Sequence, residues 1–244
     1  MFIFAVMIVS VTYSQPGFTI SLTGAYALPL PDLKGDLTDS LERAAGESYF
    51  MKTGYSVGLK GKYGVGRKKN IRLTLGGAYS RFSVDDSYHH TNHIEVHRNI
   101  SIITASLGAE YSFLPKEKTN PFLGLELTGN FFSGKSDETV TADSTADHDE
   151  LGTTTENLKS ASRFGIAVGG GVEVTFNKTF GAVFGFKYNL ANLVGKEYNS
   201  TSVVGEYNLN DKEESTNKAK NISFVQIYGG VNFYFGHPRK VVKK

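Results

Sequence analysis

The chain has 244 residues, of which 26 are basic and 24 acidic, so its formal net charge is only +2. This near balance gives no reason to expect a nucleic acid or another strongly anionic partner. The absence of cysteine excludes a disulfide scaffold, a lipidated N-terminal cysteine and thiol chemistry. The length fits one domain. With 27 glycines, 13 tyrosines and 17 phenylalanines but no tryptophan, the composition favours strands over long helices.

Residues 1–14 form an apolar run that ends at the small residues Thr12 and Ser14. The run predicts a secretory signal peptide that is cleaved near Ser14 and Gln15. It is shorter than the roughly 20 apolar residues that a membrane-spanning helix needs. The run lacks the Lys or Arg that usually precedes such a segment, and a buried N-terminal strand is the alternative interpretation.

From residue 17 onward, apolar residues alternate with small or polar ones, which is the pattern of strands with two chemically different faces. The alternation predicts eight strands, near 18–28, 50–63, 71–82, 98–113, 121–132, 162–176, 179–190 and 222–235. The strand near 162–176 shows it most clearly. Ile100 and Ile102 break the pattern at one end of the fourth strand.

The connections between these strands alternate in length. Short turns lie near 64–70, 115–120 and 177–178, and long polar segments lie near 29–50, 83–97, 133–161 and 191–221. Up-and-down membrane barrels place short turns in the periplasm and long loops outside the cell. We therefore expect an all-β fold, an eight-stranded antiparallel up-and-down transmembrane β-barrel over residues 15–235. Residues 236–244 would then form a basic periplasmic tail.

Alternation alone also fits a soluble lipocalin-type barrel with its apolar face turned inward. The polar face decides between them, because it consists mainly of Gly, Ala, Ser and Thr, which suit a narrow lumen better than a water-exposed surface. Its few charges have both signs, and unpaired they would be costly to bury. We expect a lumen charge network formed by Lys60, Arg72, Glu110, Glu126, Arg163, Glu173 and Lys187.

Strand length and the placement of aromatics agree with a membrane. About 12 residues at roughly 3.3 Å each, tilted by about 40°, rise about 30 Å, which is close to the apolar thickness of a bilayer. Aromatic residues gather toward both ends of the strands, which is typical of interfacial girdles. The long segments are rich in Asp and Glu, whereas the turns and the tail are rich in Lys and Arg.

The whole mature chain resembles the small eight-stranded outer-membrane barrels of diderm bacteria, the OmpA/OmpX-type superfamily. The most specific element is the closing strand 225–235, with alternating apolar residues up to Phe233 and Phe235. The resemblance implies that these two residues belong to a signal for the barrel-assembly machinery, and that the protein resides in the outer membrane with lipid and lipopolysaccharide around it. Two departures are that Phe235 is not terminal and that no peptidoglycan-binding domain follows.

Candidate chemistry is sparse. His89, His90, His93 and His97 cluster beside carboxylates in one long connection and are weak candidates for a metal site, but their spacing matches no zinc signature. The acidic segment 133–161 lacks the spacing of a calcium loop. No GxSxG or comparable nucleophile motif occurs. We therefore expect no cofactor and no catalytic residues.

These observations favour a non-enzymatic barrel with a plugged lumen and a structural or surface-interaction role for its acidic loops. Two alternatives are a narrow channel for small solutes or ions and a lipid-modifying enzyme of the outer membrane. The pattern does not identify an extracellular partner.

Overall fold

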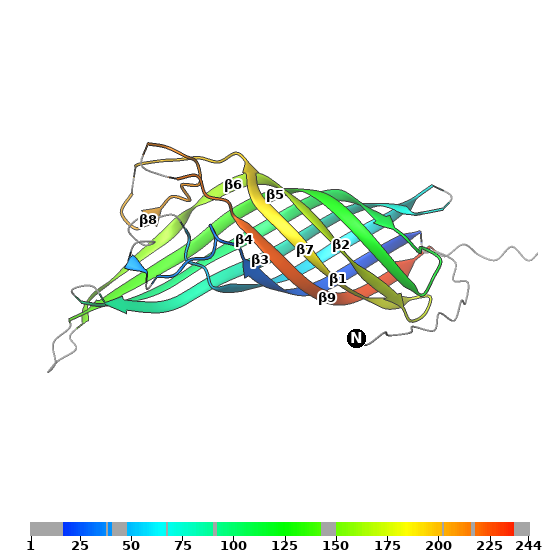
Figure 1. Cartoon of the computed structure of the whole chain (residues 1–244), viewed down its shortest axis with the longest axis horizontal. Coiled ribbons are helices and arrows are strands. Elements are labelled where there is room, and N and C mark those ends of the chain that lie inside the picture. The colour runs from blue at the N-terminus through cyan, green and yellow to red at the C-terminus, as the bar shows by residue number, and fades with distance from the viewer. Residues whose placement is uncertain are drawn as a thin grey trace, which may run out of the picture.

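A computed structural model of the chain describes residues 17–37, 39–40, 48–66, 68–89, 92–142, 150–201, 203–215 and 218–236. Strands dominate the described residues (Figure 1). Among them, no helix is long and apolar enough to cross a membrane. The predicted signal peptide, residues 1–14, and the predicted tail beyond Gly236 lie outside the described residues, so both stay predictions.

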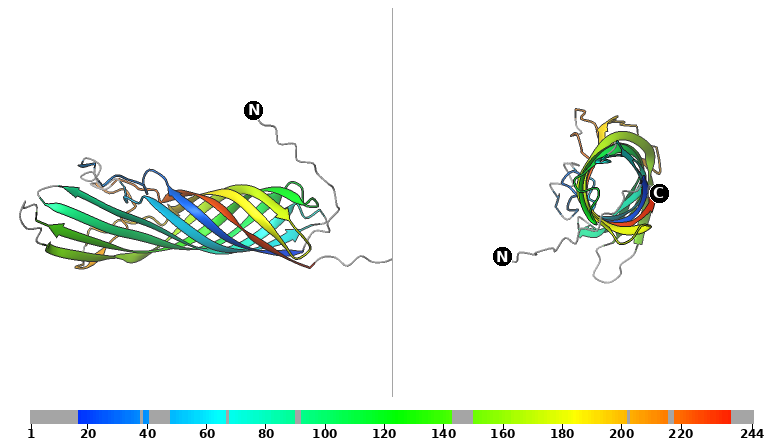
Figure 2. Two further views of the ribbon diagram at one scale, coloured as in Figure 1. Left: turned by 90° about the horizontal axis from the view of Figure 1, so that it is seen from below. Right: turned by 90° about the vertical axis from the view of Figure 1, so that its right-hand side faces the viewer.

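Eight strands close into one ring in which every neighbouring pair is antiparallel. They are β1 (Phe18–Pro29), β2 (Thr53–Val65), β3 (Ile71–His89), β4 (His93–Ser112), β5 (Thr119–Thr141), β6 (Glu150–Thr175), β7 (Phe180–Val194) and β9 (Ser223–Phe235). The first and last of them pair along their length, from Phe18 opposite Phe235 to Pro29 opposite Phe224. Viewed end-on, the ribbon forms a continuous ring (Figure 2, right). The predicted fold is therefore confirmed.

Large apolar side chains cover the outside of the ring. Leu75, Leu107 and Leu127 lie in one cross-strand row and are 61–69% exposed. The positions between them on each strand point inward and are mostly Gly, Ser, Thr and Ala. Tyr26 and Tyr55 are direct cross-strand partners at one end of this belt, and Phe18 and Phe235 are partners at the other. The belt thus has aromatic residues at both borders.

The prediction that residues 83–97 and 133–161 are loops is wrong. β3 and β4 continue pairing as far as His89 and His93, and β5 and β6 continue as far as Thr141 and Glu150. The left view of Figure 2 shows these strands, coloured teal to green, reaching furthest from the short turns. We call the added parts of the four strands, residues 83–89, 93–97, 133–141 and 150–161, the wall.

The sequence pattern did not predict the wall, because apolar and polar residues exchange faces there relative to the belt. Within the belt, Ile103 and Phe131 point outward, whereas their chain neighbours Ile102 and Phe132 point inward and are at most 2% exposed. Beyond these pairs the inward face gains apolar residues such as Val84 and Val96 beside some polar ones such as Ser136, whereas the outward residues described are polar. This inversion explains why Ile100 and Ile102 break the pattern: both are fully buried inside the ring.

Two long connections cover the inward face of the wall. The segment that follows β1 contributes Leu33, Tyr49, Phe50 and Met51, and the segment between β7 and β9 contributes Leu209 and Ile222. They pack against inward residues of the ring, namely Ala27, Phe82, Val84, Val96, Ile100, Ile102, Phe132, Leu158, Ala191 and Phe224. We call this buried cluster the cap core. Within the second connection the short strand β8 (Glu206–Tyr207) pairs in parallel with β6.

Phe132→Ala tests the cap core, and Phe131→Ala is its matched control one residue away. Phe132 is 2% exposed inside the cap core, whereas Phe131 is 56% exposed on the belt. Because the first change leaves a cavity, it should lower the free energy of unfolding by about 3–5 kcal/mol. Phe131→Ala leaves a gap that lipid can fill, so it should lower the free energy of unfolding clearly less. Urea unfolding of the reconstituted protein measures both, and equal losses would contradict the cap core.

Candidate functional site

A network of charged side chains crosses the lumen near the short turns. Glu173 accepts hydrogen bonds from Lys62 Nζ at 2.8 Å and from Arg72 at 2.5 Å. Glu110 contacts the same two cations, with Arg72 at 2.9 Å and Lys62 Nζ at 3.2 Å. Both carboxylates and Lys62 are at most 4% exposed. Each of these buried charges therefore has a partner of opposite sign inside the ring.

The network continues toward the middle of the barrel. Lys60 contacts Glu126 closely and lies 3.4 Å from Glu110, and Lys187 lies 3.8 Å from Glu126. Four cations therefore face three carboxylates in this part of the lumen. The structure brings together six of the seven residues that the sequence singled out, namely Lys60, Arg72, Glu110, Glu126, Glu173 and Lys187.

Lys62 belongs to this network but was not among the predicted members. It follows Lys60 by two residues on the same strand face, so the alternation itself contained the signal. Its ammonium also lies 4.7 Å from the centre of the Phe122 ring, and the Arg72 guanidinium lies 5.5 Å from it. Phe122 is 4% exposed and points inward, so it gives both cations an aromatic surface.

Glycines on neighbouring strands make room for these long side chains. Glu126 pairs across the strands with Gly108, and Glu110 pairs with Gly124. A Cβ at Gly108 would lie 2.2 Å from the Leu125 carbonyl oxygen and 2.9 Å from Glu126 Cγ. The lumen is thus filled to the point where some inward positions accept only glycine.

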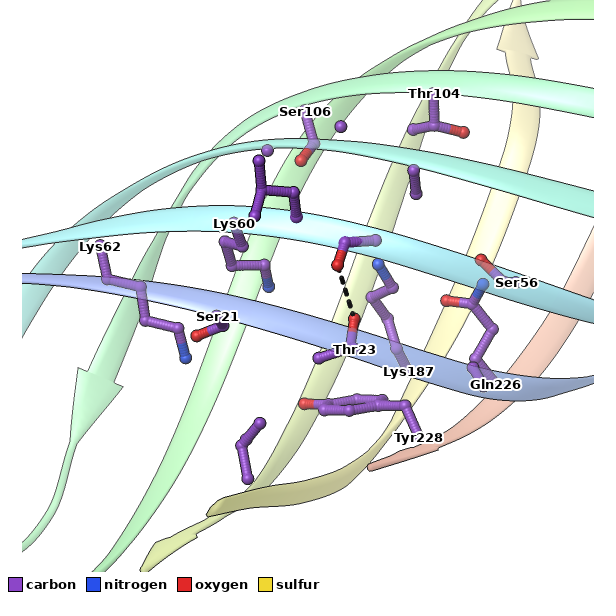
Figure 3. A pocket seen from close by; sticks show the side chains of 17 residues that line it. Ser21, Thr23, Ser56, Lys60, Lys62, Thr104, Ser106, Lys187, Gln226 and Tyr228 are labelled. Atoms are coloured by element: carbon purple, nitrogen blue, oxygen red, sulfur yellow. Dashed lines mark hydrogen bonds between the residues drawn. The ribbon is translucent and has the colours of Figure 1, made fainter. Parts of the chain in front are cut away.

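A cavity of about 50 Å³ lies beside the network on the side of the cap core. Lys60 of β2, Lys187 of β7, and Gln226 and Tyr228 of β9 approach it (Figure 3). It has room for a few water molecules, since one needs at least about 10–15 Å³. The Phe82 and Phe224 rings, 5.0 Å apart, belong to the cap core beyond Gln226. The lumen is therefore filled at two levels with a small polar cavity between them.

Arg163, the seventh predicted member, does not join the network. It lies nearer the cap core, where its Nε and Nη2 both donate to Asp211 at 3.0 Å. Asp211 is fully buried, and it also accepts from the Asn192 side chain at 2.8 Å and from the Glu197 backbone N–H at 3.0 Å. This cluster fixes the connection between β7 and β9 to the inside of the ring.

The cluster extends to the connection that follows β1. The Tyr49 hydroxyl donates to the Leu209 carbonyl at 2.9 Å, and burial together with nearby Asp211 raises the pKa of Tyr49 well above its usual value. The Lys220 ammonium lies 5.1 Å from the centre of the Tyr49 ring, and burial lowers the pKa of Lys220. Both long connections are therefore held together through buried polar contacts as well as the cap core.

Three of the four predicted histidines, His89, His93 and His97, lie on strands of the wall and not in a loop. His97 Nδ1 is 2.8 Å from Asp85, and this hydrogen bond raises the pKa of His97. His93 is 3.4 Å from Glu95. His89 ends β3, but its side chain and all of His90 lie outside the described residues. Among the residues that are described, no group of three or more His, Asp or Glu side chains could hold a metal ion.

The outer face of the wall carries rows of polar side chains across four strands. One row joins Asp85, His97, Asp137 and Thr155. Thr155 donates to Asp137 at 2.5 Å and Lys135 donates to it at 2.9 Å, and these hydrogen bonds lower the pKa of Asp137. The next row joins Ser87, Glu95, Thr139 and Thr153. Hydrogen bonds link the side chains of this face, and the residues in these two rows are all polar.

The belt of exposed apolar residues decides where the protein resides. Leu, Phe, Tyr and Val side chains that are 40–70% exposed surround the ring, far more than a water-soluble surface tolerates. The ring is closed, so its strands have no unpaired edge within the belt, as a bilayer requires. The protein is an outer-membrane β-barrel. The predicted localisation is therefore confirmed.

Comparisons with known proteins return solved structures of low sequence identity. No family model and no curated protein matches the sequence. Neisserial surface protein A is 16% identical, with 91% of this chain and 100% of that chain covered and a TM-score of 0.45. OprG from Pseudomonas aeruginosa is 13% identical, with 92% and 98% covered and a TM-score of 0.48. Ail, the attachment invasion locus protein of Yersinia pestis, is 11% identical, with 88% and 97% covered and a TM-score of 0.36.

The two residues of the predicted assembly signal face outward at the turn end of the barrel. Phe233 and Phe235 are 41% and 48% exposed, and the Phe235 ring lies 6.2 Å from the ring of Phe18 on the neighbouring strand. Both residues therefore belong to the aromatic border of the belt. Their part in recognition by the barrel-assembly machinery stays a prediction.

Asp211→Ala tests the buried cluster, with Glu197→Ala as its control. Both carboxylates contact Arg163, but Asp211 is fully buried whereas the Glu197 side chain is 76% exposed. Loss of Asp211 leaves Arg163 buried without its partner and should cost about 3–5 kcal/mol, whereas loss of Glu197 should cost less than about 1 kcal/mol. We expect a protease to cleave within residues 195–222 much faster in the Asp211→Ala variant than in the Glu197→Ala variant. Equal cleavage of the two variants would contradict the cluster's role.

Proposed function

We propose that this outer-membrane barrel is a non-enzymatic scaffold that does not conduct, and that it displays the wall as an interaction surface. The observation that carries the proposal is the filling of the lumen at two levels, by the charge network and by the cap core. A water-filled path would have to cross both. This supports a role on the surface of the barrel more than one inside it.

The proposal includes an orientation. Short turns join β2 to β3, β4 to β5 and β6 to β7, whereas the wall and both long connections lie at the other end of the ring. In outer-membrane barrels the short turns face the periplasm. The wall therefore stands outside the cell, and lipopolysaccharide surrounds its base.

The wall suits binding because the residues of its outer face do not belong to the cap core. Its inward residues build the cap core, whereas outward residues such as Ser87, Glu95 and Thr139 are held only by contacts along the sheet surface. A rigid, paired sheet presents polar groups with little loss of conformational entropy on binding. Its carboxylates favour a partner with cationic or hydrogen-bonding groups.

Planar-bilayer recordings test the closed lumen. The purified wild-type barrel should give no large and stable current, because water and ions would have to pass both the charge network and the cap core. A porin of known conductance, reconstituted under the same conditions, serves as the positive control. A steady current of the porin kind would exclude the proposal and favour a channel.

Site-specific crosslinking in living cells tests the wall. A photoreactive amino acid at Ser87 or Thr139, on the outer face of the wall, should form an adduct with an extracellular partner. The same amino acid at Leu107, on the lipid-facing belt, is the matched control and should not form that adduct. Adding Asp85→Asn and Asp137→Asn should weaken the wall adduct. If the wall positions give no adduct beyond that of Leu107, the interaction role is wrong.

A further inference from the structure

The turn end of the barrel carries a ring of lysines. Each of the three short turns has one exposed lysine, namely Lys68 between β2 and β3, Lys116 between β4 and β5, and Lys178 between β6 and β7. Lys69 and Lys118 are half-buried beside them. Glu117 is the single acidic residue in these turns. We call Lys68, Lys116 and Lys178 the lysine rim.

Hydrogen bonds to neighbouring strands hold the three turns in place. The Asn70 side chain donates to the Ser112 carbonyl at 2.8 Å, and the Ser112 N–H donates to the Asn70 carbonyl at 2.7 Å. The Thr175 N–H donates to the Lys118 carbonyl at 2.7 Å, and the Tyr234 N–H donates to the Thr179 carbonyl at 2.8 Å. The backbone of the lysine rim is therefore fixed around the ring, and only the side chains must be ordered when a ligand binds.

Aromatic pairs lie directly beside the lysine rim on the outside of the barrel. The rings of Tyr111 and Phe113 are 5.1 Å apart, and those of Phe176 and Phe180 are 5.9 Å apart. Aromatic girdles of membrane barrels lie at the level of the lipid headgroups. Lysines that directly follow such a girdle reach the phosphate groups of the adjacent leaflet, with their apolar stems along the aromatic surface.

We propose that the lysine rim binds the headgroups of anionic phospholipids in the periplasmic leaflet. Lysines next to a membrane surface attract acidic lipids, and this attraction is screened by salt. The neighbouring girdle favours a lipid over a soluble polyanion, because a soluble ligand would not require cations placed at the membrane border. At the other end of the barrel, the described part of the wall presents carboxylates among its outward residues, namely Asp85, Glu95 and Asp137.

The test uses the full folded chain in phosphatidylcholine vesicles with trace amounts of spin-labelled lipid. Electron paramagnetic resonance measures how strongly labelled phosphatidylglycerol is retained at the barrel relative to labelled phosphatidylcholine. We expect retention to be about two- to fivefold stronger for phosphatidylglycerol. The combined variant Lys68→Gln, Lys116→Gln and Lys178→Gln should abolish this preference, and added salt should weaken it.

The matched control changes three lysines at the other end, Lys34→Gln, Lys159→Gln and Lys212→Gln, which removes the same total charge. This control should keep the preference for phosphatidylglycerol. If the rim variant keeps the preference, or if the control loses it equally, the proposal is wrong. Binding of soluble polyphosphate by the wild-type barrel, without any preference for phosphatidylglycerol, would assign the rim to a soluble polyanion and also overturn the proposal.

Discussion

The narrowness of an eight-stranded ring governs the rest of this structure. Such a ring leaves a lumen that side chains alone can fill, so every inward residue must be small or must have a partner. Near the turns the partners are opposite charges, and glycines such as Gly108 and Gly124 provide the space that Glu126 and Glu110 occupy. Near the loops the partners are apolar side chains from two connections that fold back over the ring.

The four strands that form the wall, β3 to β6, pass through both the bilayer and the space beyond it. Inside the bilayer they turn apolar residues outward to lipid, and beyond it they turn apolar residues inward to the cap core. The change occurs between adjacent residues, Ile102 with Ile103 on β4 and Phe131 with Phe132 on β5. Because side chains alternate along a strand, two consecutive apolar residues suffice to exchange the faces. β4 stays in register with both of its neighbours across the exchange, whereas β5 and β6 shift register between Phe132 and Gly134.

Alternation along the sequence predicts the ring well, because side-chain direction in a strand depends only on position. It correctly turned Lys60, Glu110 and Glu173 inward, and the same reasoning applies to Lys62. It failed for the wall, where an inverted pattern with many polar residues looks like a loop. It also placed Arg163 on the inward face, but it could not identify the partner Asp211, because that residue lies in an irregular connection whose path depends on tertiary packing.

The two ends of the barrel differ in what their connections must do. The long connections stabilise the fold from inside, through Tyr49, Asp211 and the cap core, so their buried residues are constrained. The outer face of the wall and the exposed lysines of the turns contribute little to that packing. Their chemistry can therefore change at small cost in stability. The carboxylates of the wall and the lysine rim are thus better explained by the partners proposed for them than by what they stabilise.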